Sequence, residues 1–167
     1  MRVVLLTGPP GVGKTTVLRA LMNALGADGV HYAAVEVEAL ALVNPWPDDD
    51  AAFTHLEFVA DSFRRRGYPL LLAAATIEDR GYLRRLLSAL GSDDVLLVRL
   101  EAPPEVLTER LIRREPPDWI GLPRLLDAVG ELASSLTALP GIDLVFSTVD
   151  ADPRLVAAAV RRALGTA

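Results

Sequence analysis

The chain has 167 residues, 51% of them hydrophobic, which suits one domain with a sizeable core and argues against disorder. A net charge of −5 disfavours a nucleic-acid partner, because no basic surface is available to neutralise a phosphate backbone. The lack of cysteine excludes thiolate metal sites, and two histidines are too few for a histidine cluster, so Mg²⁺ held with a nucleotide is the expected metal. We find no signal peptide and no membrane-spanning apolar run, and we expect a cytoplasmic, single-domain protein (residues 1–167) without a membrane partner.

Short β-rich runs alternate with stretches of helical periodicity along the whole chain. This alternation predicts an α/β fold of three layers, a parallel five-stranded sheet with helices on both faces. The predicted strands are residues 2–6, 31–37, 70–75, 95–100 and 142–147. The predicted helices are residues 14–25, 51–66, 76–90, 104–115 and 124–139, with a last one that begins at Asp152 and Pro153. Residues 116–123 break the pattern between two helices, and we interpret them as a short strap that acts as a lid.

The first predicted strand is followed by Gly8-Pro9-Pro10-Gly11-Val12-Gly13-Lys14-Thr15, which fits the P-loop pattern G-x-x-x-x-G-K-[ST]. A helix follows directly, so the motif stands in the strand, loop and helix context that a P-loop requires. Glycines let successive backbone N–H groups point toward one place, and the positive end of the helix adds to the attraction of a polyphosphate. The sequence therefore predicts a site for ATP or GTP.

The roles within this P-loop follow from its residue types. Pro9 and Pro10 lack an N–H group, which leaves residues 11–15, Val12 among them, as the expected phosphate donors. Lys14 is expected to reach the β- and γ-phosphates, and the Thr15 hydroxyl to occupy one position on Mg²⁺. Thr16 either contacts the α-phosphate or is an ordinary first-turn helix threonine. The predicted cofactor-binding residues are Gly8, Gly11, Val12, Gly13, Lys14, Thr15, Thr16 and Arg110.

Acidic residues follow the second strand, at the edge of the sheet where ligands of α/β proteins collect. Glu36 and Glu38 are two residues apart, so on a strand they share one side. We expect both to contact a phosphate acceptor, with Glu38 the preferred base for its hydroxyl proton; alternatively, both are exposed strand-end carboxylates. The third strand ends without an aspartate, so the Walker B role is either missing or displaced to Glu78 or Asp79, which alternatively only begin a helix.

Arginines lie on one face of the helix before the strap. We expect Arg110 to bind the base or the phosphates of the nucleotide, and Arg114, with Arg124 across the strap, to stabilise the transferred phosphoryl group. The alternative is a solvated charged face. With Lys14 and Glu38, Arg110 and Arg114 complete the predicted catalytic set.

Two further residues are candidates for contact with the acceptor. Trp46 stands between prolines beside three aspartates, either as an aromatic rim over the acceptor pocket or as a core residue. An acidic mouth favours a cationic or polyhydroxyl acceptor over a phosphorylated one. Asp61 is the second candidate, and after Glu38 it is, with Glu78, the next choice for the base.

These motifs resemble a known family. The run GPPGVGKTT, the five strands, the pattern A-P-P-E-x-x-x-x-R-L-x-x-R-R-E over residues 102–115 and the short strap resemble P-loop small-molecule kinases related to nucleoside-monophosphate, shikimate and gluconate kinases. The run Val35-Glu36-Val37-Glu38-Ala39-Leu40 is similar to the acidic motif of chloramphenicol phosphotransferases, in which the residue matching Glu38 is the base. The resemblance implies a 2-3-1-4-5 strand order, ATP or GTP with Mg²⁺, and phosphoryl transfer to a hydroxyl.

The leading hypothesis is a phosphotransferase that moves the γ-phosphoryl group to a hydroxyl of a small molecule, a metabolite or an antibiotic, and works as a monomer or homodimer. One alternative is a regulatory NTPase module, which would show nucleotide-dependent partner binding without turnover stimulated by an acceptor. Another is a kinase of the nucleoside-monophosphate type, in which arginines would line the acceptor pocket. A GTPase switch is disfavoured because the sequence has no N-K-x-D motif.

Overall fold

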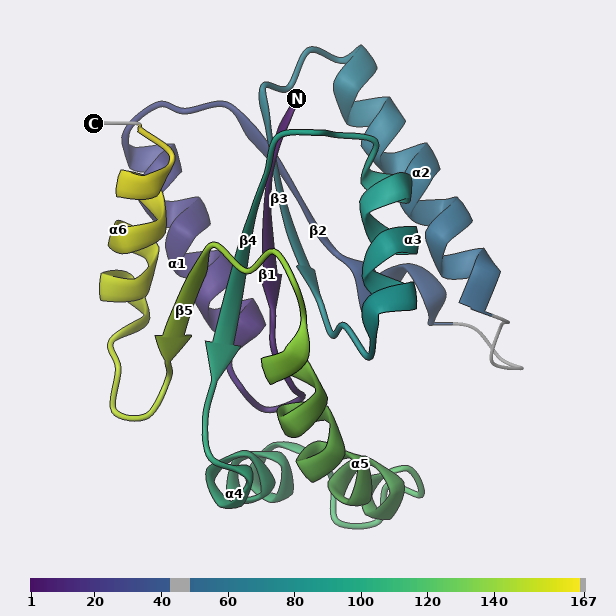
Figure 1. Ribbon diagram of the computed structural model, residues 1–167. Coiled ribbons are helices and arrows are strands. Elements are labelled where there is room, and N and C mark those ends of the chain that lie inside the picture. The colour runs from purple at the N-terminus through teal and green to yellow at the C-terminus, as the bar shows by residue number, and fades with distance from the viewer. Residues whose placement is uncertain (43–48, 166–167) are drawn as a thin grey trace.

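The computed structural model describes residues 1–42 and 49–165 and has a central sheet of five parallel strands in the order β2-β3-β1-β4-β5, as predicted (Figure 1). The strands are β1 (Arg2–Thr7), β2 (Tyr32–Glu36), β3 (Leu70–Ala75), β4 (Val95–Glu101) and β5 (Leu144–Ser147). The α-helices are α1 (Lys14–Ala27), α2 (Asp49–Arg65), α3 (Arg80–Leu90), α4 (Pro104–Arg114), α5 (Leu122–Ser135) and α6 (Pro153–Ala163). Two short 3₁₀ helices, η1 (Val37–Ala41) and η2 (Leu136–Ala138), complete the described elements.

The apolar strand β1 forms the centre of the sheet, paired with β3 on one side and β4 on the other. Alternate residues of a strand point to opposite faces, so a strand that is covered on both faces is apolar throughout. Accordingly, Leu5 packs with α2 and α3 on one face, while Leu6 packs with α1 and α6 on the other. Figure 1 shows these helix pairs on either side of the sheet, with α4 and α5 beyond the carboxyl ends of the strands. All five strands therefore direct their last residues toward one edge.

Several element boundaries differ from the predicted ones, each for a local reason. β2 ends at Glu36, whose register partner is Ala74, and η1 begins at the next residue, so Glu38 lies on η1 and not on the strand. The helix predicted from residue 76 begins only at Arg80, because Asp79 is its N-cap and accepts a hydrogen bond from Tyr82 N at 2.8 Å. Residues 76–79 are thereby left as a loop at the carboxyl end of β3.

The last strand starts two residues later than predicted. The side chain of Asp143 accepts a hydrogen bond from Leu97 N at 2.8 Å. In a continued strand, a backbone carbonyl would accept this bond. The strap is also shorter, since α5 begins at Leu122 and only residues 115–121 connect it to α4. Two turns, from Trp119 N to Pro116 O and from Leu122 N to Trp119 O, shape this connection. Among the helices in the described parts of the chain, none is long and apolar enough to cross a membrane.

Candidate active site

The P-loop has the backbone geometry that its glycines predict. Gly8, Gly11 and Gly13 all have positive φ angles, of 154°, 81° and 101°. A Cβ atom at Gly8 would lie 2.5 Å from Leu100 O, so the loop passes too close to β4 for any side chain there. Only a glycine fits the start of this loop.

The backbone N–H of Val12, one of the predicted phosphate donors, has a partner inside the loop. Its backbone N–H donates to Pro9 O at 3.2 Å and so closes a turn inside the loop. Its side chain is fully buried in the core cluster beneath α1. Val12 therefore stabilises the curve of the P-loop from within, because its N–H group already has a partner.

Lys14 is held over the loop by three acceptors. Its Nζ donates to Gly8 O at 2.8 Å, to Pro9 O at 3.4 Å and to Thr76 Oγ1 at 2.8 Å. Burial lowers the pKa of the Lys14 ammonium to about 8. The charge of Arg114 also lowers this pKa, whereas the carboxylates of Glu38 and Glu36 raise it. The ammonium thus lies in the field of the predicted base and of one predicted catalytic arginine.

Thr15 and Glu36 are in direct contact. The Thr15 hydroxyl donates to Glu36 Oε2 at 2.7 Å, which brings the first turn of α1 to the end of β2. A hydroxyl and a carboxylate are the oxygen ligands that Mg²⁺ prefers. Within residues 1–42 and 49–165 there is no cluster of three or more histidine, aspartate or glutamate residues that could hold a metal. A magnesium ion at this place would accordingly need phosphate oxygens as further ligands, as in a nucleotide complex.

Glu38 reaches the same place from η1. Its Oε1 accepts a hydrogen bond from Thr76 N at 2.5 Å, in the loop after β3. The predicted reason for its placement, a shared strand face with Glu36, does not hold because β2 ends first. The two carboxylates nevertheless line one cavity, since the turn of η1 brings the second of them back toward the loop.

A cavity of about 550 Å³ brings most of the predicted site residues together. Its lining includes the P-loop residues Gly11, Gly13 and Lys14, both helix threonines Thr15 and Thr16, and Arg110 and Arg114. Glu36, Glu38 and Thr76 line it as well. The cavity therefore joins a phosphate cradle, two carboxylates and two guanidinium groups.

Arg110 is fixed by the loop that follows β5. Its Nη1 donates to Thr148 Oγ1 at 3.0 Å and its Nη2 to Thr148 O at 2.8 Å. Thr148 N in turn donates to Glu101 O at 2.9 Å, at the end of β4. Arg110 also lines a second cavity of about 220 Å³, between the P-loop and the start of α6. It stands at the junction of the two cavities, where a nucleotide would pass from its phosphates to its base.

Arg114 lies at the rim of the larger cavity and is more than half exposed. Its Nε donates to Glu115 Oε1 at 2.6 Å. Arg124, expected to close on the same group from the other side of the strap, is exposed on α5 and is not among the residues that line this cavity. The structure thus brings Arg114 to the site without Arg124.

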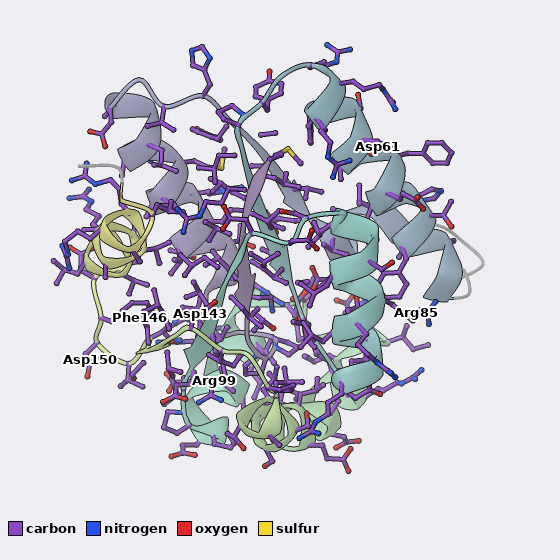
Figure 2. The ribbon with its side chains drawn as sticks, turned by 45° about the horizontal axis from the view of Figure 1, so that its top comes forward. Asp61, Arg85, Arg99, Asp143, Phe146 and Asp150 are labelled. Atoms are coloured by element: carbon purple, nitrogen blue, oxygen red, sulfur yellow. The ribbon has the colours of Figure 1, made fainter. Side chains whose placement is uncertain are left out.

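One predicted acceptor contact, Asp61, and both candidates for the displaced Walker B role do not line the cavity. Asp61 pairs with Arg64 and Arg65 on the last turns of α2. Figure 2 shows Asp61 well separated from Arg99. Arg99 pairs in register with Thr7, the last residue before the P-loop, and so marks the end of the sheet that holds the site. Asp79 is engaged as the α3 cap, and neither it nor Glu78 lines the cavity. Trp46 lies outside the described residues.

Two threonines of the site were not predicted. Thr76 and Thr148 directly follow β3 and β5, at the edge of the sheet where ligands collect, and this position is the signal that could have identified them. Their residue type carries no such signal, because a threonine fits loops of every kind. Each holds one of the predicted cationic groups, Lys14 or Arg110.

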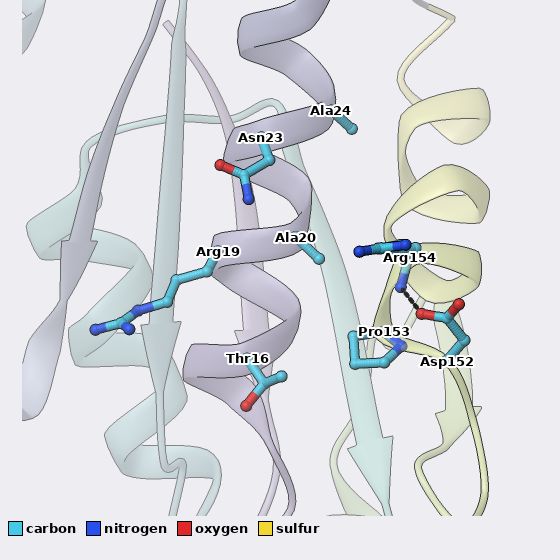
Figure 3. Close-up of a pocket in the computed structure, with 8 residues that line it drawn as sticks. All are labelled: Thr16, Arg19, Ala20, Asn23, Ala24, Asp152, Pro153 and Arg154. Carbon is cyan, nitrogen blue, oxygen red and sulfur yellow. Dashed lines mark hydrogen bonds between the residues drawn. The ribbon is translucent and has the colours of Figure 1, made fainter.

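A third cavity continues outward from Thr16. This groove of about 670 Å³ lies between α1 and α6, with Arg19 and Asn23 on one side and Arg154 on the other (Figure 3). Asp152 Oδ1 accepts a hydrogen bond from Arg154 N at 2.9 Å, which confirms Asp152 as the N-cap of α6. The Asp152 carboxylate at the edge of this groove therefore serves as a helix cap.

Comparison with known proteins agrees with this geometry. The sequence matches the AAA_33 family, described as an AAA domain, over residues 3–121. A search of curated proteins by sequence gave no match.

Solved structures with the same fold include a resistance protein and two kinases. The tunicamycin resistance protein of Deinococcus radiodurans is 23% identical with a TM-score of 0.68, and the alignment covers 98% of this chain and 95% of that one. A sugar kinase from Janibacter sp. HTCC2649 is 22% identical with a TM-score of 0.69, covering 100% and 96%. Shikimate kinase from Acinetobacter baumannii, solved with shikimate, is 19% identical with a TM-score of 0.61, covering 99% and 94%. The chain belongs to the AAA_33 family and has the fold of the small-molecule P-loop kinases.

Proposed function

We propose that the protein is a kinase that transfers the γ-phosphoryl group of ATP or GTP to a hydroxyl group of a small molecule. The observation that carries this proposal is the shared cavity, in which Lys14 and Thr15 of the P-loop face Glu36 and Glu38 from β2 and η1. A triphosphate cradle alone suits any P-loop NTPase. A carboxylate beside it suits transfer to an acceptor.

The P-loop residues and Arg110 would bind the nucleotide. The backbone N–H groups at the start of α1 and the Lys14 ammonium would attract the phosphates, and the Thr15 hydroxyl and the Glu36 carboxylate would hold a magnesium ion. The ion would neutralise charge on the β- and γ-phosphates. Arg110, fixed by Thr148, would orient the nucleotide between its phosphates and its base.

Glu38 would act as the base of the transfer. The acceptor oxygen forms a bond to the γ-phosphorus while the bond to the β–γ bridging oxygen breaks, and the nucleoside diphosphate leaves. The proton of the acceptor hydroxyl passes to the Glu38 carboxylate. Arg114, at the rim of the cavity, would stabilise negative charge on the transferred group.

The segment that carries Glu38 offers no cation to an acceptor. Residues 20–63, which include η1 and most of α2, contain no lysine or arginine. Figure 1 shows η1 and the start of α2 beside the loop between β3 and α3, on the side of the site away from α6. A carboxylate or phosphate on the acceptor would meet no cation from this segment, so uncharged and cationic acceptors are the first choice for assays. The sugar kinase and the tunicamycin resistance protein, by their names, suggest polyhydroxyl compounds as the first acceptors to assay.

A screen of nucleotide consumption tests the proposal. ATP or GTP with Mg²⁺ is incubated with sugars, aminosugars, nucleosides and hydroxyl-bearing antibiotics, and phosphorylated products are identified by mass spectrometry. We expect an acceptor-stimulated rate that Lys14→Ala abolishes and that Glu38→Gln lowers about 100-fold at nearly unchanged nucleotide affinity. Slow hydrolysis that no acceptor stimulates, combined with nucleotide-dependent partner binding, would instead identify a regulatory module.

A further inference from the structure

The loop after β3 supplies one residue that touches both sides of the site. Thr76 Oγ1 accepts a hydrogen bond from Lys14 Nζ at 2.8 Å, and Thr76 N donates to Glu38 Oε1 at 2.5 Å. Lys14 belongs to the P-loop and Glu38 to η1, so Thr76 joins the phosphate lysine to the predicted base. Thr76 also lines the shared cavity.

The chemistry of the two contacts separates what each part of Thr76 does. An ammonium is only a donor, so the hydroxyl oxygen of Thr76 is the acceptor and its own hydrogen stays available to another group. The backbone N–H is a donor to a carboxylate, which makes the bond to Glu38 short and charge-assisted. The side chain therefore holds Lys14 and the backbone holds Glu38.

The position of Thr76 adds a third observation. The end of β3 is where a Walker B carboxylate is sought, and here that strand ends in alanines followed by Thr76, while Asp79 is used as a helix cap. From these contacts we infer that Thr76 is a positioning residue for the transfer: it fixes the Lys14 ammonium and the Glu38 carboxylate relative to each other so that phosphate and acceptor hydroxyl meet in line. This inference rests on the proposed kinase function and assigns β3 its part in it.

Two substitutions separate this role from a structural one. Thr76→Val has nearly the same shape and keeps the backbone N–H but removes the hydroxyl, whereas Thr76→Ser keeps the hydroxyl. We expect Thr76→Val to lower kcat about 10- to 100-fold while the KM for the nucleotide stays within about threefold. Thr76→Ser is expected to retain at least about a third of the wild-type kcat. Thr137→Val, which removes an exposed hydroxyl of η2 outside the cavity, is the matched control.

A wild-type kcat in Thr76→Val, or equal losses of kcat in the valine and serine variants, would overturn the positioning role.

Two measurements that need no turnover distinguish a failure of the positioning role from a failure of the kinase proposal. The amide proton of Thr76 should resonate far downfield and move upfield in Glu38→Gln, because a neutral amide is the weaker acceptor. The effects of Thr76→Val and Lys14→Gln on unfolding free energy should be non-additive, as for groups in contact.

If the wild-type protein phosphorylates no acceptor, the kinase proposal fails, and the two measurements still decide whether Thr76 links Lys14 to Glu38. An amide shift that Glu38→Gln leaves in place, or strict additivity of the two substitutions, contradicts the link whatever the activity of the enzyme.

Discussion

The Thr15 hydroxyl and the Glu36 carboxylate, 21 residues apart in sequence, are joined by a hydrogen bond of 2.7 Å. It connects the first turn of α1 to the end of β2, so the residue that is expected to bind Mg²⁺ is oriented by the second strand. The third strand, which ends without a carboxylate, contributes Thr76 instead. The acidic partner of the P-loop threonine thus comes from β2.

Glu36→Gln should impair the use of magnesium. The glutamine keeps an acceptor for the Thr15 hydroxyl but loses the negative charge that attracts a cation. We expect the Mg²⁺ concentration needed for half-maximal activity to rise about tenfold. The measurement is a Mg²⁺ titration of the acceptor-stimulated rate at saturating nucleotide. Asp93→Asn, an exposed carboxylate in the turn before β4, is the control, and an equal shift in both variants would contradict a specific role for Glu36.

Nucleotide affinity should fall as the pH rises through about 8. Burial lowers the pKa of Lys14 to about 8, so the ammonium of the empty protein loses its proton near this pH and its attraction for the phosphates disappears. Calorimetric titration with ATP or GTP between pH 7 and 9.5 measures the effect. Lys14→Gln should bind more weakly and without this dependence; the same decline in both proteins would assign the dependence to another group.

Lys14→Gln should stabilise the empty protein. The pKa of Lys14 is lowered from 10.5 in an unfolded chain to about 8, so below that pH folding buries a charge at a cost. Replacing it is expected to raise the unfolding free energy by roughly 1–3 kcal/mol at pH 7. Between about 8 and 10.5 the unfolded state binds more protons than the folded state, so the wild type gains stability with pH and the difference shrinks. Urea unfolding of both proteins at pH 7 and 10 checks both the sign and the trend.

The fold was predictable because the apolar strands, their spacing and the P-loop carry strong patterns. Lys14, Thr15 and Glu36 could be placed from the same patterns, since each stands at the carboxyl end of a strand or at the start of the helix that follows it. One of the two reasons for predicting Glu38 does not hold: it reaches the cavity through the turn of η1 and not through strand alternation. The other reason, the resemblance of its motif to that of chloramphenicol phosphotransferases, does not depend on the strand boundary.

Asp61 shows what helical periodicity leaves open. The pattern predicts which face of α2 is polar but not which end of the helix lies near the site. At about 1.5 Å per residue, Asp61 lies roughly 18 Å along the helix from Asp49, where α2 begins.

The hydroxyl contacts of Thr76 and Thr148 could not be predicted from the sequence for another reason: they depend on side chains that meet only once the strands have paired.

Gly8→Ala and Gly13→Ala should differ in stability although both alter the P-loop. Both glycines have positive φ, which costs an alanine roughly 1–3 kcal/mol. A Cβ at Gly8 would also lie 2.5 Å from Leu100 O and 2.8 Å from Val12 Cγ1, whereas at Gly13 nothing lies within 4 Å. We expect Gly8→Ala to lose more than about 4 kcal/mol in urea unfolding and Gly13→Ala only the backbone cost. Equal losses would show that β4 yields to the new methyl group.

Arg110→Lys should weaken nucleotide binding more than Thr148→Val does. The guanidinium group reaches both the hydroxyl and the carbonyl of Thr148, and an ammonium on a flexible stem cannot reproduce that fork. The valine variant removes only the hydroxyl acceptor and leaves the bond to the carbonyl. We expect the Kd to rise about tenfold for Arg110→Lys and about two- to fivefold for Thr148→Val, measured by calorimetry.

The matched control for this pair is Arg113→Lys, since Arg113 is exposed on the same helix and lines neither cavity. We expect the Kd for the nucleotide to be highest in Arg110→Lys, intermediate in Thr148→Val and unchanged in Arg113→Lys. If the loop after β5 fixes Arg110 for the nucleotide, loss of the hydroxyl must have an intermediate effect, because one of two bonds remains. A Thr148→Val protein with wild-type affinity beside a weakened Arg110→Lys would mean that Arg110 acts through its charge alone, without being held in place.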